Sequence, residues 1–129
     1  MKKEINNTAH APAPVGPYNQ SVRVGGWLYI SGQIGIIPET GVFEHADIES
    51  ETHQVLKNIK AVLSSAGMGM EDVVKCSVFV ADMKMYSRIN AVYAEYFNED
   101  FAPARELVEV AALPKYVRVE ISAIAYKDE

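Results

Sequence analysis

The feature that most constrains the fold is an apolar stripe between residues 48 and 66. Its members recur at alternating spacings of four and three residues, the repeat of one helix face: Ile48, Thr52, Val55, Ile59, Val62 and Ala66. Asp47 stands where a side-chain cap is expected, and Gly67 suits the left-handed backbone just past a helix end. The sequence therefore predicts an amphipathic helix that covers an apolar layer.

Runs of β-forming residues before and after this helix predict the layer that it covers. A Gly25-Gly26 turn separates two of them, which is typical of a β-hairpin. A second helix is predicted over roughly Met85–Phe97. The predicted strands are Ser21–Val24, Trp27–Ser31, Val73–Val80, Ala104–Val110 and Tyr116–Tyr126. The order ββαβαββ predicts an α+β fold, with two helices on one face of one sheet.

The chain is short enough to form a single domain over residues 1–129. The N-terminal segment differs from the rest in composition, because "HAPAPVGPYNQ" is too rich in Pro and Gly for a helix or a central strand. We therefore expect residues 1–20 to form an N-terminal arm that leads into the fold.

Both faces of the predicted sheet carry large apolar side chains. Side chains alternate along a strand, so Trp27 and Tyr29 point away from Leu28 and Ile30. Two helices cover only one face. The simplest explanation is that other copies of the chain cover the second face.

The amino-acid composition limits the kinds of molecule that the chain is expected to bind. The chain carries 12 Lys and Arg against 17 Asp and Glu, a net charge of −5, so the sequence predicts no binding to nucleic acid or to an anionic membrane surface. A single cysteine excludes an intramolecular disulfide. No apolar run approaches the roughly 18 residues that span a bilayer. Because the start also lacks the apolar core of a secretory signal, we expect a cytoplasmic protein.

Two charged residues within the predicted strands are candidate site residues. A guanidinium on a rigid strand suits bidentate binding of a carboxylate, but Arg105 is equally explained by a surface ion pair with Glu106 or Glu109. Glu120 falls on the sheet face away from the helices. It is either a carboxylate partly buried by a second chain, with a raised pKa, or a solvated residue paired with Arg118 or a lysine on a neighbouring strand. The residues alone leave both questions open.

The other polar candidates are weaker. The three histidines, His10, His45 and His53, lack metal-ligand spacing, so no metal site is predicted. Cys76 lies within a strand and is interpreted as a small buried apolar residue. Asn90 stands beside the apolar stripe of the second helix and would contact a ligand only if that helix borders a cleft.

The segment "PARELVEVAALPKYVRVEI", residues 103–121, resembles the C-terminal signature of the reactive intermediate deaminases, the RidA or YjgF family. Further blocks follow the family order: "APAPVGPYNQSV", "LYISGQIG", "QVLKNIKAVLSSAG", "VVKCSVFVADM" and "NAVYAEYF". The resemblance runs almost from end to end. The combination of blocks is specific, although any single block is not.

The resemblance implies a chorismate-mutase-like fold assembled as a homotrimer, with active sites in clefts between subunits and no cofactor. The implied activity is hydrolysis of reactive enamine or imine intermediates, such as 2-aminoacrylate, to 2-keto acids and ammonia. Pyridoxal-phosphate enzymes release such intermediates from amino acids. By the same resemblance, Arg105 binds the substrate carboxylate, Glu120 orients the attacking water, and the site is lined by Tyr18, Ser31, Gly32 and Asn90.

One departure from the family pattern keeps an alternative open. Leu107 stands where the family often has Cys or Thr. It lies two residues after Arg105 on the predicted strand, so both side chains are expected on the same face and in the same cleft. The added bulk would shift the substrate range or weaken turnover. A non-catalytic sensor of 2-keto acids is therefore the alternative function. Ribonuclease or translation-inhibitor activity, attached to some relatives, is disfavoured by the net charge of −5, and a true chorismate mutase is disfavoured because one arginine is few for a dicarboxylate.

Overall fold

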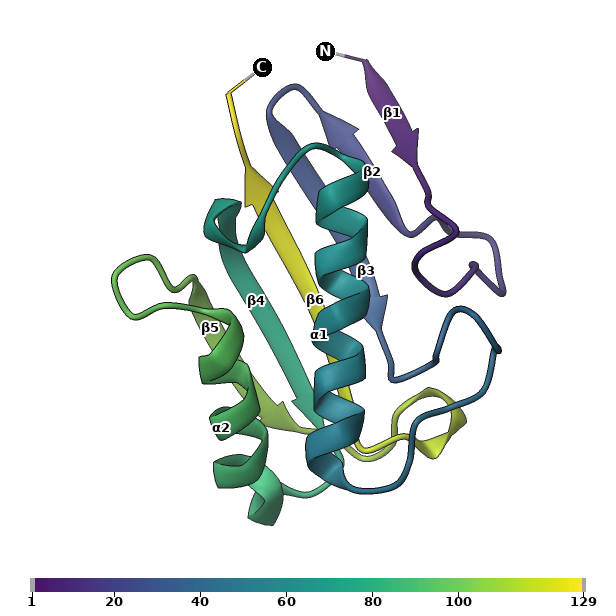
Figure 1. Cartoon of the computed structure of the whole chain (residues 1–129), viewed down its shortest axis with the longest axis vertical. Helices are drawn as coiled ribbons and strands as arrows, with labels where there is room; N and C mark the ends of the chain where they lie inside the picture. Colours follow the sequence, from purple (N-terminus) through teal and green to yellow (C-terminus); the bar gives the residue numbers. More distant parts are fainter. Residues whose placement is uncertain (1, 129) are drawn as a thin grey trace.

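The computed structural model describes residues 2–128 and shows one six-stranded sheet (Figure 1). The strand order is β1-β2-β3-β6-β4-β5, and every neighbouring pair is antiparallel except β4 and β5, which run parallel. The strands are Lys3–Asn6 (β1), Ser21–Val24 (β2), Trp27–Gln33 (β3), Val73–Val80 (β4), Ala104–Glu109 (β5) and Val119–Tyr126 (β6). The predicted α+β fold with one mixed sheet is confirmed.

Two helices lie on the same side of this sheet (Figure 1). The first, α1 (Ile48–Ser65), packs across β3 and β6, and the second, α2 (Tyr86–Tyr96), lies beside α1. Short 3-10 turns stand at Met70–Asp72, Met83–Met85 and Pro114–Tyr116. Within residues 2–128, no helix combines the length and the apolar character needed to cross a membrane.

The predicted helix stripe forms the centre of the core. Val55, Ile59 and Val62 are fully buried between α1 and the sheet. The backbone N–H of Ser50 donates to Asp47 Oδ1 at 2.7 Å, which satisfies one of the free donors at the helix start. Gly67 has a φ of +75° just past the helix end, so both predicted helix boundaries are confirmed.

The outer face of the sheet, away from the helices, stays apolar and open in one chain. Leu28 and Ile30 are buried, whereas Trp27 and Tyr29 on the opposite face are 41% and 49% exposed. The predicted alternation along this strand is therefore confirmed. Val108 of β5 extends the exposed apolar outer face to the far edge of the sheet.

The structure differs most from the predicted elements in the arm and in the last strand. The arm contains a strand, β1, which pairs with β2 although only Ile5 gives it apolar character. The last strand begins at Val119 rather than Tyr116, because Lys115 and Tyr116 adopt positive φ values of 57° and 55° that no strand accommodates. Arg118 therefore lies before the strand, and strand parity does not place its side chain.

We expect Ile59→Ala to lower the free energy of unfolding by about 2–5 kcal/mol, because it removes a fully buried side chain from beneath α1. Lys60→Ala is the matched control, since Lys60 is exposed on the same helix, and a change within about 0.5 kcal/mol is expected. Urea denaturation at one fixed protein concentration measures both. Equal losses for the two variants would contradict the assignment of the core.

Candidate functional site

A cavity of about 390 Å³ opens where the N-terminal arm, the end of β3 and the start of β6 meet. Four predicted site residues line it: Tyr18, Ser31, Gly32 and Glu120. Most of the remaining lining is apolar, and Lys115 is the one cationic side chain that lines it in the described part of the chain. The fold thus brings together Tyr18 and Glu120, which lie 102 positions apart in the sequence.

Gly32 and Glu120 depend on each other. A Cβ atom at position 32 would stand 1.9 Å from Oε2 of Glu120, so only glycine leaves room for this carboxylate. Glu120 is partly buried, and burial raises the pKa of its carboxyl above the ordinary value. A half-buried carboxylate at a cavity wall is suited to accept a proton or to orient a water molecule.

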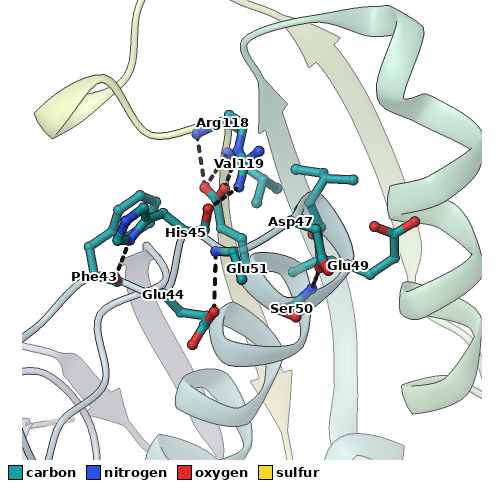
Figure 2. Close-up of polar contacts among 12 residues, drawn as sticks. Phe43, Glu44, His45, Asp47, Glu49, Ser50, Glu51, Arg118 and Val119 are labelled. Carbon is teal, nitrogen blue, oxygen red and sulfur yellow. Dashed lines mark hydrogen bonds and ion pairs between the residues drawn. The ribbon is translucent and has the colours of Figure 1, made fainter.

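One of the two alternatives for Glu120, an ion pair with Arg118, is wrong. Arg118 Nε donates instead to Glu51 of α1 at 2.6 Å (Figure 2). The reason is that Arg118 precedes β6, so its side chain turns towards α1 instead of following the alternation of the strand. The pKa of Glu120 is therefore not set by an ion pair with Arg118, and it is burial that raises it.

The arm is held over the cavity by a residue that the sequence did not reveal. Gln20 is 2% exposed, and its Nε2 donates to the carbonyl oxygens of Thr8, Ala11 and Pro12 at 2.9, 3.1 and 2.8 Å. A single Gln before a strand has no pattern that distinguishes it from a surface residue. The hydroxyl of Ser31 donates to the carbonyl of Asn19 at 2.6 Å, which ties β3 to the same arm.

Arg105 lies outside the cavity, against α2. Its Nη1 donates to Asn90 Oδ1 at 2.9 Å and its Nη2 to the Tyr86 hydroxyl at 3.3 Å. The guanidinium carbon stands 4.7 Å from the ring centre of Tyr93, a cation–π distance. Asn90 therefore holds Arg105 in this chain, a contact that the sequence did not predict.

The alternative explanation of Arg105 as a surface ion pair is wrong. Glu106 pairs with Lys75 at 3.0 Å and accepts a hydrogen bond from Ser77. Glu109 accepts from the backbone N–H of Met83 at 2.8 Å. Among residues 2–128, no carboxylate lies within ion-pair distance of Arg105. The guanidinium is positioned by neutral groups, and its positive charge is not neutralised by a partner.

Leu107 shares its sheet face with Arg105, as the alternation of side chains along the strand predicted. It is partly buried, packs against the hydrophobic core and does not line the cavity. Within one chain, the geometry gives Leu107 a packing role. Its effect on substrates stays a prediction.

Arg105 and Glu120 project from opposite faces of the sheet. On β4, Arg105 pairs with Cys76, which is buried under the helices. Glu120 pairs with Phe79, three residues further along β4, whose side chain points to the opposite face of the sheet. Paired residues share a face, so one side chain points towards α2 and the other towards the outer face. The two candidate groups therefore lie on opposite faces of one chain.

Beneath Arg105 lie two buried polar groups. Burial raises the pKa of the Cys76 thiol to about 11, and burial beside that thiol also raises the pKa of Tyr93. Both groups stay protonated near neutral pH, and Cys76 is buried as predicted. Among the described residues, no group of three or more His, Cys, Asp and Glu side chains is placed to hold a metal ion.

Comparison with known proteins defines the class to which this fold and cavity belong. Residues 8–127 match the family described as Endoribonuclease L-PSP. Among solved structures, YyfA of Yersinia pestis, a protein of the conserved Rid family, is 46% identical, covers 98% of this chain and 100% of its own, and superposes with a TM-score of 0.94.

Proteins compared by sequence agree with this class. The RutC family protein PH0854 of Pyrococcus horikoshii is 51% identical over 126 residues, 98% of this chain and 99% of that protein. A Bos taurus protein named 2-iminobutanoate/2-iminopropanoate deaminase is 46% identical over 125 residues, 97% of this chain and 90% of the bovine protein. The chain belongs to the Rid family, as the sequence resemblance predicted.

We expect Gly32→Ala to displace the Glu120 carboxylate, because the new methyl group would occupy its place. Gly16→Ala is the control, since a Cβ there meets only Tyr18, at an ordinary contact distance of 3.5 Å. Crystal structures of the two variants measure the displacement. A Glu120 side chain that stays in place in Gly32→Ala would contradict the packing described above.

Proposed function

We propose that this protein hydrolyses reactive enamine and imine intermediates of the 2-aminoacrylate type to 2-keto acids and ammonia, in the cytoplasm. The observation that carries the proposal is a pair of complementary groups: an uncompensated guanidinium on Arg105 and a half-buried carboxylate on Glu120 beside an apolar cavity. The bovine relative named as a deaminase supports the same chemistry.

The active site is proposed to form between two chains of a homotrimer. Arg105 and Glu120 lie on opposite faces of one chain's sheet, so a single chain cannot direct both at one small substrate. The apolar outer face, with Trp27 and Tyr29 exposed, is the surface that a neighbouring chain would cover. In this arrangement, one chain contributes Arg105 and its neighbour contributes the cavity.

The proposed reaction needs neither a nucleophilic side chain nor a cofactor. The imine tautomer of the substrate has an electrophilic carbon. Arg105 binds the substrate carboxylate through two parallel hydrogen bonds, which fixes the direction of that carbon. Glu120 orients a water molecule and accepts its proton as the oxygen attacks. Return of that proton to the nitrogen completes a tetrahedral carbinolamine. Transfer of its hydroxyl proton to the nitrogen, through Glu120, then breaks the carbon–nitrogen bond as the carbonyl forms, which leaves the 2-keto acid and ammonia.

The family description also names RNA cleavage. The net charge of −5 and the largely apolar cavity disfavour binding of a phosphate backbone. The proposal therefore favours a small carboxylate as substrate.

We expect the protein to accelerate keto-acid formation when a serine dehydratase generates 2-aminoacrylate in situ, with spontaneous hydrolysis subtracted. Arg105→Ala should lower kcat/KM at least about tenfold, because hydrogen bonds to charged groups contribute about 1.5–3 kcal/mol. Arg88→Ala is the matched control, since Arg88 forms an exposed ion pair with Glu49 away from the cavity. Full activity in Arg105→Ala would contradict the proposal, and binding of 2-ketobutyrate without acceleration would favour the sensor.

The pH profile tests the role of Glu120. Burial raises the pKa of its carboxyl, and the charged form is the one that accepts a proton, so kcat/KM should rise with pH through a pKa above that of an ordinary glutamate. Glu120→Gln should be slow and should lack this acid limb. If the variant kept the same acid limb as the wild-type protein, another group would be responsible for it.

A further inference from the structure

Glu51 is a fully buried carboxylate in the first turn of α1. It accepts three hydrogen bonds from two consecutive residues: Arg118 Nε at 2.6 Å, Arg118 N at 2.9 Å and Val119 N at 3.3 Å (Figure 2). A buried carboxylate is costly unless charge and hydrogen bonds compensate it, and here both do. Glu51 does not line the cavity, so a direct contact with a ligand there is not its role.

The position of Glu51 follows from where β3 ends. The last registered pair between β3 and β6 joins Gln33 to Ile121, so the N–H groups of Arg118 and Val119 lie beyond that pairing. Buried backbone donors need an acceptor, and the two carboxylate oxygens of Glu51 supply it. On the other side, the carbonyl of Arg118 accepts from the backbone N–H of Ala81 at 2.9 Å. Residues 118 and 119 are thus held from two directions.

The residues on either side of this anchored pair form one wall of the cavity. Pro114 and Lys115 line it before the anchor, and Glu120 lines it immediately after. A displacement of the backbone at Val119 would therefore be passed on to the carboxylate of Glu120. Because Glu120 fits against Gly32 with no room for a methyl group, a small displacement changes that contact.

Helix α1 fixes the opposite wall as well. Asn58, 1% exposed, donates to the carbonyl oxygens of Ile34 and Ile36 at 3.1 and 2.9 Å, and both isoleucines line the cavity. Between them, a Cβ at Gly35 would stand 3.1 Å from Cγ of Glu51, so this segment also packs directly on Glu51. The two walls are held by polar groups of one helix.

We propose that Glu51 is a positioning residue of the active site: it fixes the backbone at 118–119 so that the Glu120 carboxylate stands beside Gly32. This inference rests on the function proposed above. It requires a carboxylate, because three donors converge on two oxygens. An amide would direct its own N–H groups towards at least one of these donors.

Glu51→Gln tests the proposal in two independent ways. In steady-state kinetics, kcat should fall about 10- to 100-fold, because catalysis depends steeply on the placement of the reacting groups. KM should stay within about twofold, since Arg105 is untouched. In hydrogen–deuterium exchange, the amides of residues 113–121 should exchange faster, because their anchor is weakened.

Glu49→Gln is the matched control. Glu49 lies on the same helix turn and forms a two-bond ion pair with Arg88 at 2.7 and 2.6 Å, but that pair is exposed and holds no cavity wall. It should change neither kcat nor exchange at residues 113–121. If Glu51→Gln does not fold, Glu51→Asp withdraws the same two oxygens by one methylene group, and the same two changes are expected at smaller size.

Three results would overturn the proposal: unchanged exchange at residues 113–121, faster exchange with unchanged kcat, or equal effects in Glu49→Gln. An inactive wild-type protein would refute the proposed deaminase function. In that case, the exchange measurement alone would decide whether Glu51 holds this segment.

Discussion

The alternation of side chains across one sheet is the constraint on which this site depends. Because β5 and β6 flank β4 in a fixed register, Arg105 is committed to the helix side and Glu120 to the outer side. No change of side-chain rotamer can bring the guanidinium and the carboxylate together, because the sheet lies between them. The fold of a single chain therefore carries both groups of the proposed chemistry but separates them, and the apolar outer face offers the surface on which a second chain would reunite them.

The helices do more than cover the core. Helix α2 presents Asn90 and Tyr93 to Arg105, which fixes a guanidinium without neutralising its charge. Helix α1 buries its apolar stripe against the sheet and, on the same element, directs Glu51 and Asn58 at the two walls of the cavity. Packing energy that folds the chain thereby also holds the site in shape, which is the rigid support that precise positioning requires.

The features that could be predicted from the sequence are those that depend on residue periodicity and on local capping residues. The stripe from Ile48 to Ala66 predicted α1 with its cap. The alternation of side chains separated Trp27 from the buried Leu28 and placed Glu120 on the sheet face away from the helices, as the structure has them. The family resemblance supplied the roles, since periodicity alone did not separate Arg105 from a surface ion pair.

What the sequence did not reveal are contacts between distant polar residues. Glu51 and Arg118 are 67 positions apart, and an acidic residue in a first helix turn is ordinarily explained by the helix dipole. Gln20 holds the arm through bonds that follow no spacing rule. The turn at Lys115 and Tyr116 requires positive φ values that their residue types disfavour, so alternation extended the last strand too far.

Mixing two impaired variants tests the divided site most directly. Arg105→Ala and Glu120→Gln chains are unfolded together in equal amounts, refolded and assayed against each variant refolded alone. If one chain contributes Arg105 and its neighbour Glu120, random assembly restores both groups at about a quarter of the sites, and activity should return to about that fraction of the wild-type level. A mixture no more active than its parents, although the chains have exchanged, would contradict the account.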